Sequence, residues 1–328
     1  MYNLPYHKIN LSDFSFLITG GAGFIGSNIV EYLLKYNAKK VRVLDNLSNG
    51  YYSNISEFEN HPSFEFLQGD IRDLDTCKKA MIGIDYVSHQ AALGSVPRSI
   101  NDPITTNSVN ISGFLNMLIA TKDSDSVKRI VYAASSSTYG DSKALPKVEE
   151  NIGKPLSPYA VTKYVNELYA DVFGKIYDTD AIGLRYFNVF GPKQSPNGAY
   201  AAVIPLFIEA VKNNNGATIH GDGEQTRDFT FVENAVQANI KGFFASEKAK
   251  NQIFNIACNE RISINSLWEY INIEAKENIE AIYIKERLGD VKNSLADISK
   301  AKNLLGYKPE FTVKRGIEIL WKKNNEKK

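Results

Sequence analysis

One segment of this chain has the pattern of a strand, a glycine-rich turn and a helix. It restricts the fold more than any other feature. The apolar segment 14–19 runs into the turn TGGAGFIG at 19–26, and residues 28–36 then carry apolar side chains at helical spacing. A tight turn that joins a buried strand to a helix is typical of the start of a βαβ unit. The pattern therefore predicts a parallel sheet covered by helices.

The glycines of this turn indicate a dinucleotide site. Gly20, Gly23 and Gly26 recur at three-residue intervals, and Gly21 supplies an overlapping GxGxxG. Glycine allows the tight turn and the close approach of a pyrophosphate, while the N-terminus of the following helix offers free N–H groups. Asp45 ends the next apolar segment, 19 residues after Gly26. A carboxylate there accepts the ribose hydroxyls of NAD and repels the 2′-phosphate of NADP.

Apolar and β-branched segments alternate with helical patterns through the first half of the chain, which is typical of a doubly wound parallel sheet of the α/β class, the Rossmann arrangement. Beyond residue 185, glycine, proline and asparagine interrupt helices such as 203–212, which indicates a smaller mixed α/β region over the carboxyl end of the sheet. We expect a first domain at 1–186 and mainly a second, substrate-binding domain at 187–328, with some segments returning to the first. The other expected strands are 41–45, 64–68, 86–89, 130–134 and 182–186.

Composition excludes several classes of partner. Lys and Arg total 38 against 37 Asp and Glu, a formal charge of +1 that does not favour nucleic acid or an anionic membrane. Cys77 and Cys258 lie far apart and without metal-ligand spacing, which argues against a disulfide framework or a zinc site. Because no apolar segment approaches the ~18 residues of a membrane span, we expect a cytoplasmic protein that is not held in a membrane.

A serine run and a Tyr-x-x-x-Lys pair form the candidate catalytic group. Ser135 and Ser136 follow the expected strand 130–134, and Tyr159 stands four residues before Lys163. Positions i and i+4 share one helix face, so the ammonium can lie near the phenol, lower its pKa from ~10 and make it a base near neutral pH. A serine hydroxyl is expected to share the proton of a substrate hydroxyl.

Tyr139 and Lys143 match the same Tyr-x-x-x-Lys spacing. Gly140, Asp141 and Ser142 between them indicate a turn, whereas residues 159–169 have helical periodicity after a Ser-Pro entry. We therefore assign catalysis to the later pair.

The motifs TGGAGFIG, GDIRD, SSSTYG, YFNVFG and RDF, together with Tyr159 and Lys163, resemble the extended short-chain dehydrogenase/reductase family over nearly the whole chain. Within it, HQAALGSVPRS, AASSSTYG and NGAYAAVIP are similar to UDP-N-acetylhexosamine 4-epimerases of bacterial surface-polysaccharide pathways. The resemblance implies an NAD-bound enzyme and a homodimer that packs two helices of each subunit, at 107–121 and 159–173. Leu115, Leu118 and Ile119 would suit either the dimer contact or the sheet.

The resemblance also implies site residues. Ser135 falls on the catalytic Ser/Thr, with Ser136 the next candidate, and Tyr159 and Lys163 on the base and its partner. The cofactor contacts are Gly20, Gly23, Phe24, Ile25, Gly26, Asp45, Asn46, Asp70, Ile71, Gln90, Ala91, Ala92, Asn107, Tyr159, Lys163 and Tyr186. The UDP-sugar contacts are Gly94, Ser95, Ser135, Ser136, Asn188, Gln194, Ala202, Val203, Arg227, Arg287, Asp290 and Ser294.

Two positions bear on the substrate. Ser294 stands where galactose-type epimerases carry a bulky Tyr against C2 of the sugar, so that an N-acetyl group has room. Gly94 departs from the family, which often has Lys there near the diphosphate, and Arg98 or another cation is a candidate replacement.

The implied reaction is reversible epimerisation at C4 of UDP-N-acetylglucosamine and UDP-N-acetylgalactosamine through a 4-keto sugar. Alternatives within the fold are an epimerase of UDP-glucose or UDP-glucuronate and a nucleotide-sugar dehydratase or decarboxylase. Dehydratases typically carry Asp-Glu after the catalytic hydroxyl, whereas Ser136 and Ser137 follow Ser135 here. A catalytically silent NAD-bound scaffold is a further alternative, which the presence of the serine, tyrosine and lysine disfavours.

Overall fold

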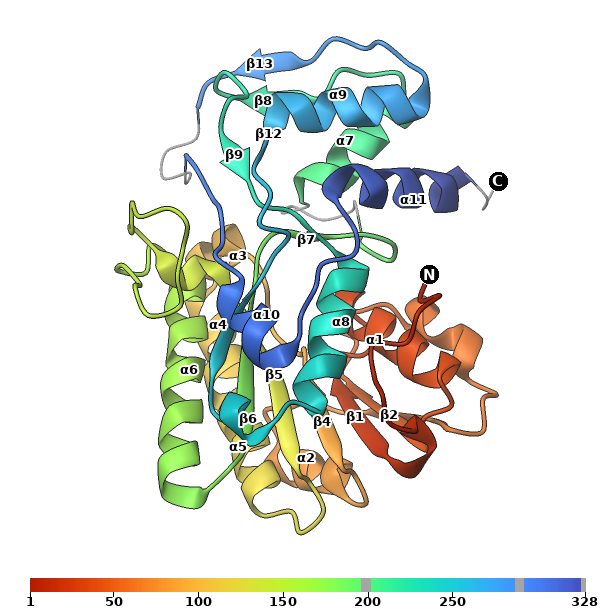
Figure 1. The fold of residues 1–328 in the computed structure, drawn as a ribbon, viewed down its shortest axis with the longest axis vertical. Coiled ribbons are helices and arrows are strands. Elements are labelled where there is room, and N and C mark those ends of the chain that lie inside the picture. Colours follow the sequence, from red (N-terminus) through yellow and green to blue (C-terminus); the bar gives the residue numbers. More distant parts are fainter. Residues whose placement is uncertain (196–201, 287–291, 326–328) are drawn as a thin grey trace.

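The computed structural model describes residues 1–195, 202–286 and 292–325. Its centre is a seven-stranded sheet in the order β11-β6-β5-β4-β1-β2-β3, in which every neighbouring pair is parallel (Figure 1). The doubly wound α/β prediction is thus confirmed. The strands are β1 (Ser15–Thr19), β2 (Lys40–Asp45), β3 (Phe64–Gln68), β4 (Tyr86–His89), β5 (Arg129–Ser135), β6 (Ala181–Tyr186) and β11 (Ile253–Ile256).

Alternate side chains of the buried strands pack into two hydrophobic layers. In β1, Phe16 and Ile18 face one layer and Leu17 faces the other, as the two-residue period of a strand requires. Helices α1 (Phe24–Lys35), α8 (Val232–Phe243) and α10 (Ser299–Leu305) cover the first face. Helices α2 (Leu74–Met81), α5 (Gly113–Lys122) and α6 (Pro158–Tyr177) cover the second.

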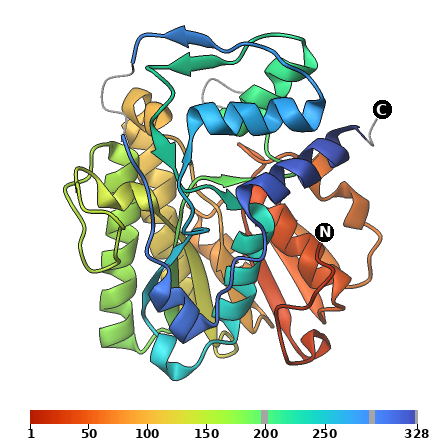
Figure 2. The ribbon, with the colours of Figure 1, turned by 45° about the horizontal axis from the view of Figure 1, so that its top comes forward.

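A further layer of helices and short strands lies beyond one end of the sheet (Figures 1 and 2) and encloses a third hydrophobic cluster. It contains helices α7 (Val203–Lys212), α9 (Ile264–Ala275) and α11 (Val313–Asn325). Three short strand pairs accompany them: β7 (Val189–Phe190) with β10 (Thr230–Phe231), β8 (Thr218–His220) with β13 (Ile282–Ile284), and β9 (Thr226–Arg227) with β12 (Ile262–Ser263).

Shorter helical segments connect these elements. They are α3 (Val96–Asn101), α4 (Pro103–Asn107), the π-helical turn η4 (Ser108–Ser112) and the 3-10 turns η1 (Leu11–Asp13), η2 (Tyr52–Asn54), η3 (Ser56–Phe58), η5 (Ser136–Tyr139) and η6 (Glu247–Ala249). No helix within the described ranges combines the length and apolar character needed to cross a bilayer.

The six strands expected from sequence form with ends within one residue of the expected ones, and the helix at 203–212 has the expected ends. The seventh strand, β11, was not predicted. It comes from the second half of the chain and pairs with β6 at the edge of the sheet. The helix expected at 28–36 begins earlier, at Phe24, directly after the glycine turn.

Candidate active site

A cavity of about 660 Å³ opens at the carboxyl ends of the central strands. Gly20 follows β1 in it, Asp45 ends β2 and Gln90 follows β4, while Ser135 and Tyr186 end β5 and β6. Ligands of doubly wound sheets bind at this edge, where the strand order reverses.

The glycine turn fits a pyrophosphate because side chains are excluded from it. Gly20 has a φ of +66°, and a Cβ on it would lie 2.7 Å from the backbone nitrogen of Ala91. A Cβ on Gly26 would overlap the carbonyl oxygen of Gly20. Gly23 precedes α1 without a side-chain cap, and the first turn of this helix lines the cavity. Its free N–H groups and positive dipole end are therefore directed into the cavity, where they can bind an anion.

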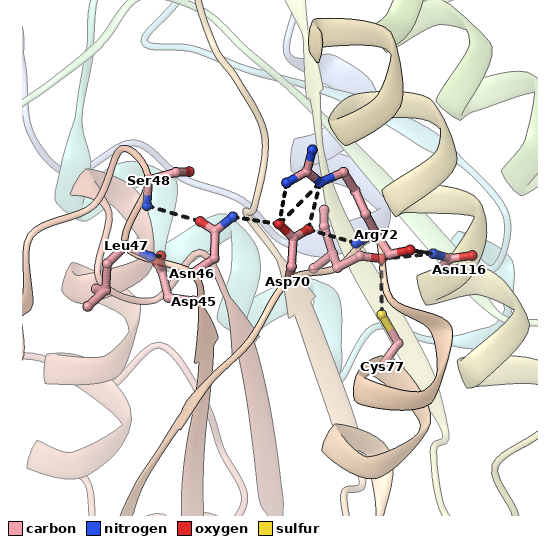
Figure 3. Close-up of polar contacts among 9 residues, drawn as sticks. Asp45, Asn46, Leu47, Ser48, Asp70, Arg72, Cys77 and Asn116 are labelled. Carbon is pink, nitrogen blue, oxygen red and sulfur yellow. Dashed lines mark hydrogen bonds and ion pairs between the residues drawn. The ribbon is translucent and has the colours of Figure 1, made fainter.

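Asp45 connects the glycine turn with the loop that follows β2. Its Oδ2 accepts a 3.0 Å hydrogen bond from Ala22 N. Its Oδ1 accepts one of 2.8 Å from the neighbouring Leu47 N (Figure 3 shows Asp45 beside Leu47). Burial raises the pKa of the Asp45 carboxyl, and the two backbone donors oppose that shift. The carboxylate is thereby placed beside the turn, as required of a ribose acceptor.

Asp70 forms the neighbouring wall. Asn46 Nδ2 donates to its Oδ2 at 2.9 Å, and Arg72 binds the same carboxylate through Nε and Nη2 (Figure 3). The hydrogen bonds from Arg72 are the main reason why the pKa of Asp70 falls to about 2. Asn116 donates to the Ile71 carbonyl oxygen at 3.0 Å and fixes the backbone of this wall.

A buried polar network lies beneath the opposite end of the cavity. Gln90 Nε2 donates to Ser88 Oγ at 3.0 Å and to Asn239 Oδ1 at 3.1 Å. Asn239, on α8, donates through Nδ2 to the Tyr186 hydroxyl at 2.7 Å. Burial raises the pKa of Tyr186 to about 12, so this phenol is a neutral hydrogen-bonding group. Gln90 and Tyr186 are thus held rigidly at the cavity wall.

Tyr159 and Lys163 lie one turn apart on α6, and both line the cavity with Ser135. Tyr159 and Ser135 share a side-chain hydrogen bond. The predicted lowering of the Tyr159 pKa by Lys163 does not dominate here, because burial raises that pKa above 10 and the bond to Ser135 only partly opposes the shift. Lys163 instead donates to the Ala133 carbonyl oxygen at 2.8 Å, and burial lowers its own pKa to about 8.

The second Tyr-x-x-x-Lys match has a different environment. Tyr139 ends the 3-10 turn η5, its hydroxyl donates to Asn255 Oδ1 at 2.6 Å, and the Arg185 guanidinium lies 4.8 Å from its ring. Gly140 follows with a φ of +51°, which ends the helical turn before Lys143. Tyr139 is therefore a core residue behind the serine segment.

Most residues predicted from sequence line this single cavity. They are Gly20, Gly23, Phe24, Ile25, Gly26, Asp45, Asn46, Asp70, Ile71, Gln90, Ala91, Ala92, Gly94, Ser95, Ser135, Ser136, Tyr159, Lys163, Tyr186, Asn188, Gln194 and Ala202. Arg287 and Asp290 lie outside the described residues.

Four predicted residues are not in the cavity wall. Asn107 is exposed at the end of α4, and the π-helical turn that follows places Val109 in the wall instead. Val203 begins α7 directly after Ala202. Arg227 and Ser294 lie together in the second region, where Ser294 N donates to the Thr226 carbonyl oxygen at 3.1 Å.

A family model described as GDP-mannose 4,6 dehydratase matches residues 17–320. The chain belongs to this family and is an extended short-chain dehydrogenase/reductase.

Relatives of this extended short-chain dehydrogenase/reductase include several sugar-nucleotide enzymes. A UDP-glucose 4-epimerase of Mycolicibacterium smegmatis is 35% identical over 92% of this chain and 95% of the relative. A UDP-N-acetylglucosamine 4-epimerase from Methanobrevibacter ruminantium, solved with UDP-N-acetylmuramic acid, has a TM-score of 0.90 at 39% identity over 96% of this chain and 99% of its own. A UDP-glucuronic acid 4-epimerase from Bacillus cereus, solved with UDP-glucuronic acid and NAD, has a TM-score of 0.88 at 30% identity over 96% and 100%.

Part of the cavity wall of this dehydrogenase/reductase was not predicted from the sequence. Residues 48–51, Asn54 and Lys193 line it and were not assigned there, whereas Arg98, a candidate replacement for the family's lysine, does line it. Lys193 is paired with Glu31 at 3.1 Å, a contact between distant segments that no local pattern indicates. Among the described residues, no His, Cys, Asp and Glu cluster has the arrangement of a metal site.

Proposed function

We propose that this chain is an NAD-dependent UDP-sugar 4-epimerase that interconverts UDP-N-acetylglucosamine and UDP-N-acetylgalactosamine. NAD is the cofactor, in line with the glycine turn, with Asp45 at the end of β2 and with the NAD found in the Bacillus cereus neighbour. One observation carries the proposal: Ser135, Tyr159 and Lys163 meet at the end of the dinucleotide cavity that also contains Tyr186.

The chain's own residues perform the proton chemistry in this proposal. Tyr159, as phenolate, removes the proton of the sugar 4-hydroxyl, and Ser135, already hydrogen-bonded to Tyr159, relays it. NAD, when bound, would accept the hydride from C4 of the sugar and give it back to the same carbon. Lys163 holds α6 against β5 through Ala133 and places its positive charge one helical turn from the phenol. The Lys163 ammonium would favour the phenolate that burial alone disfavours, and the positive charge of bound NAD would act in the same direction.

The serine segment supports epimerisation over elimination. Ser135 Oγ accepts hydrogen bonds from Ser137 N at 3.1 Å and from Ser137 Oγ at 2.8 Å. Ser136 is the other cavity residue of this segment. A dehydratase needs an acid and a base at the positions that follow the catalytic hydroxyl, and two serines occupy them here. The 4-keto sugar would therefore regain a hydride at C4 and a proton at O4 rather than be dehydrated.

The N-acetyl specificity is proposed from space around the sugar. Ser294 is small and lies against β9, next to Arg227. In the cavity wall, nothing lies within 4 Å of the position that a Cβ on Gly94 would occupy. We propose Arg227, with Arg287 and Asp290, for the UDP diphosphate and uridine, because a guanidinium fork suits a diphosphate. A firm hold on UDP and a roomy sugar pocket let the keto sugar present its other face.

We also propose a homodimer built on α6 and its neighbour α5. The outer side of α6 exposes Val161, Leu168, Val172 and Ile176. Leu118 of α5 is fully buried against the sheet, whereas Leu115 and Ile119 are half-buried. The exposed apolar side of α6 is thus left for a second copy.

The test is incubation of purified enzyme with UDP-N-acetylglucosamine, UDP-glucose and UDP-glucuronate in separate reactions, with products followed by NMR. We expect the galacto epimer from the acetylated sugar and no net NADH. Turnover of UDP-glucose or UDP-glucuronate alone would keep the reaction and contradict the specificity, and a 4-keto-6-deoxy product would contradict epimerisation itself. Ser294→Tyr should reduce turnover of the acetylated sugar selectively, with Ser299→Tyr, on the exposed start of α10, as its matched control.

A further inference from the structure

Arg98 extends across the dinucleotide cavity. It belongs to α3, which follows β4, and its Nη2 donates at 3.1 Å to the Oδ1 of Asn49, in the loop that follows β2. In the sheet, β1 lies between β4 and β2. The side chain therefore passes above the end of β1, which is where the glycine turn begins.

The loop around Asn49 is attached to that glycine turn. Tyr51 N donates to the Ala22 carbonyl oxygen at 3.1 Å, and Asn54 Nδ2 donates to the same oxygen at 2.9 Å. Asp45 accepts from Ala22 N on the other side of this residue. A guanidinium bonded to Asn49 is consequently close to the turn whose N–H groups are directed at a pyrophosphate.

Charge also distinguishes Arg98. Three of the described residues that line the cavity are cationic, namely Arg98, Lys163 and Lys193. Lys193 is paired with Glu31 and Glu57, and Lys163 is bonded to the Ala133 carbonyl oxygen. Arg98 is not among the described ion pairs, and its one described side-chain contact is to a neutral amide. Its positive charge is therefore available to an anion in the cavity.

The position of Arg98 is fixed relative to the catalytic helix. Ser95 Oγ caps α3 by accepting from Arg98 N at 3.2 Å. The next residue, Ser99, accepts a 3.0 Å hydrogen bond on Oγ from Tyr159 N. The guanidinium thus projects from a short helix that is anchored at the N-terminal turn of α6.

We propose that Arg98 is a cofactor-retention residue, which closes over bound NAD and binds its pyrophosphate on the side opposite the glycine turn. The glycine turn contributes N–H groups without a full charge, and a guanidinium adds charge-assisted, forked hydrogen bonds to the same phosphates. Retention matters here because an epimerase returns the hydride to the sugar from the cofactor molecule that took it. The inference rests on the dinucleotide site of the proposed function and is independent of the sugar specificity.

The test compares ligands that do and do not contain the diphosphate. Cofactor-free protein is titrated with ADP-ribose and with adenosine by calorimetry, for wild type, Arg98→Ala, Arg98→Lys and the exposed-arginine control Arg315→Ala. We expect Arg98→Ala to bind ADP-ribose at least about tenfold more weakly, since a hydrogen bond to a charged group contributes about 1.5–3 kcal/mol. Adenosine affinity should stay within about twofold, Arg98→Lys should recover part of the loss, and Arg315→Ala should match wild type.

A salt series and a release assay complete the test. Raising the salt concentration should weaken ADP-ribose binding less in Arg98→Ala than in wild type, because one cation–phosphate contact is gone. Preloaded NAD should leave Arg98→Ala faster, as measured by capture of the released NAD with a separate dehydrogenase. Unchanged ADP-ribose affinity, an equal loss for adenosine, or a loss confined to UDP would each overturn the proposal. Absence of epimerase activity in wild type with the ADP-ribose result intact would contradict the proposed function alone.

Discussion

Lys163 and Ala133 join the catalytic helix to the central sheet. The Lys163 ammonium, which is almost completely buried, donates a 2.8 Å hydrogen bond to the carbonyl oxygen of Ala133 on β5. Ala133 lies two residues before Ser135, and Tyr159 lies one helical turn before Lys163. This contact therefore sets the position of the Tyr159 phenol relative to the Ser135 hydroxyl.

Replacement of Tyr159 by Phe should remove turnover and leave UDP binding intact. The change removes only the hydroxyl that takes the substrate proton, so kcat should fall by about 10²–10⁴-fold. Tyr177→Phe makes the same chemical change at an exposed position of α6 and should behave as wild type. Rates from NMR and UDP affinities from calorimetry check both statements. Turnover at the wild-type level in Tyr159→Phe would refute the assigned role.

The pH dependence of stability should reveal the buried lysine. Burial lowers the pKa of Lys163 from 10.5 to about 8, so the unfolded chain binds more protons than the folded chain between these values. The contribution of Lys163 to the free energy of unfolding is lowest below pH 8 and rises as the pH increases from about 8 toward 10.5. Lys163→Met should lose this rise.

Urea denaturation at pH 7.5, 8.5 and 9.5 measures the effect. The stability of wild type minus that of Lys163→Met should increase across the series. Lys175→Met, which changes a lysine with 71% side-chain exposure on the same helix, should give a difference that stays constant. A constant difference for Lys163→Met as well would show that its pKa is not lowered.

The pair Arg185 and Glu167 should be important for stability. The guanidinium donates to both carboxylate oxygens, at 2.8 and 2.7 Å, and the two side chains are 4% and 6% exposed. Removal of one member leaves a buried charge unpaired, so Glu167→Gln should lower the free energy of unfolding by about 3–5 kcal/mol. Asp171→Asn breaks an exposed pair on the same helix and should cost less than about 1 kcal/mol. Similar values for the two variants in urea denaturation would contradict this prediction.

Local sequence patterns predicted the six strands of the central sheet that lie before residue 187. Segments such as 64–68 and 86–89 are continuous enough to give correct ends. β11 was missed because its four residues join the sheet through pairing with β6, about 70 positions away, and only that contact distinguishes it from other short apolar segments.

For the site, too, local sequence patterns gave correct predictions and long-range contacts were missed. The glycine turn, Asp45 and the Tyr159–Lys163 spacing are local patterns with a direct chemical meaning, and they line the cavity. Asn239 supports Gln90 and Tyr186 from a helix far along the chain, and no local pattern marks it. The direction of the pKa shift at Tyr159 was not predicted, because the sequence shows the spacing of the tyrosine and the lysine but not how deeply either side chain is buried.

The outer side of α6 should hold two copies of the chain together. Val161, Leu168, Val172 and Ile176 are 44–65% exposed and recur at intervals of seven and four residues, so they form one apolar stripe along the helix. A contiguous exposed apolar stripe of this kind marks a contact surface. Leu168→Asp places a charge in its middle and should convert a dimer into a monomer in sedimentation velocity. Ile82→Asp, at a residue that is 68% exposed at the end of α2, should leave the dimer intact. A monomeric wild type, or a dimer that survives Leu168→Asp together with Val172→Asp, would place the subunit contact elsewhere.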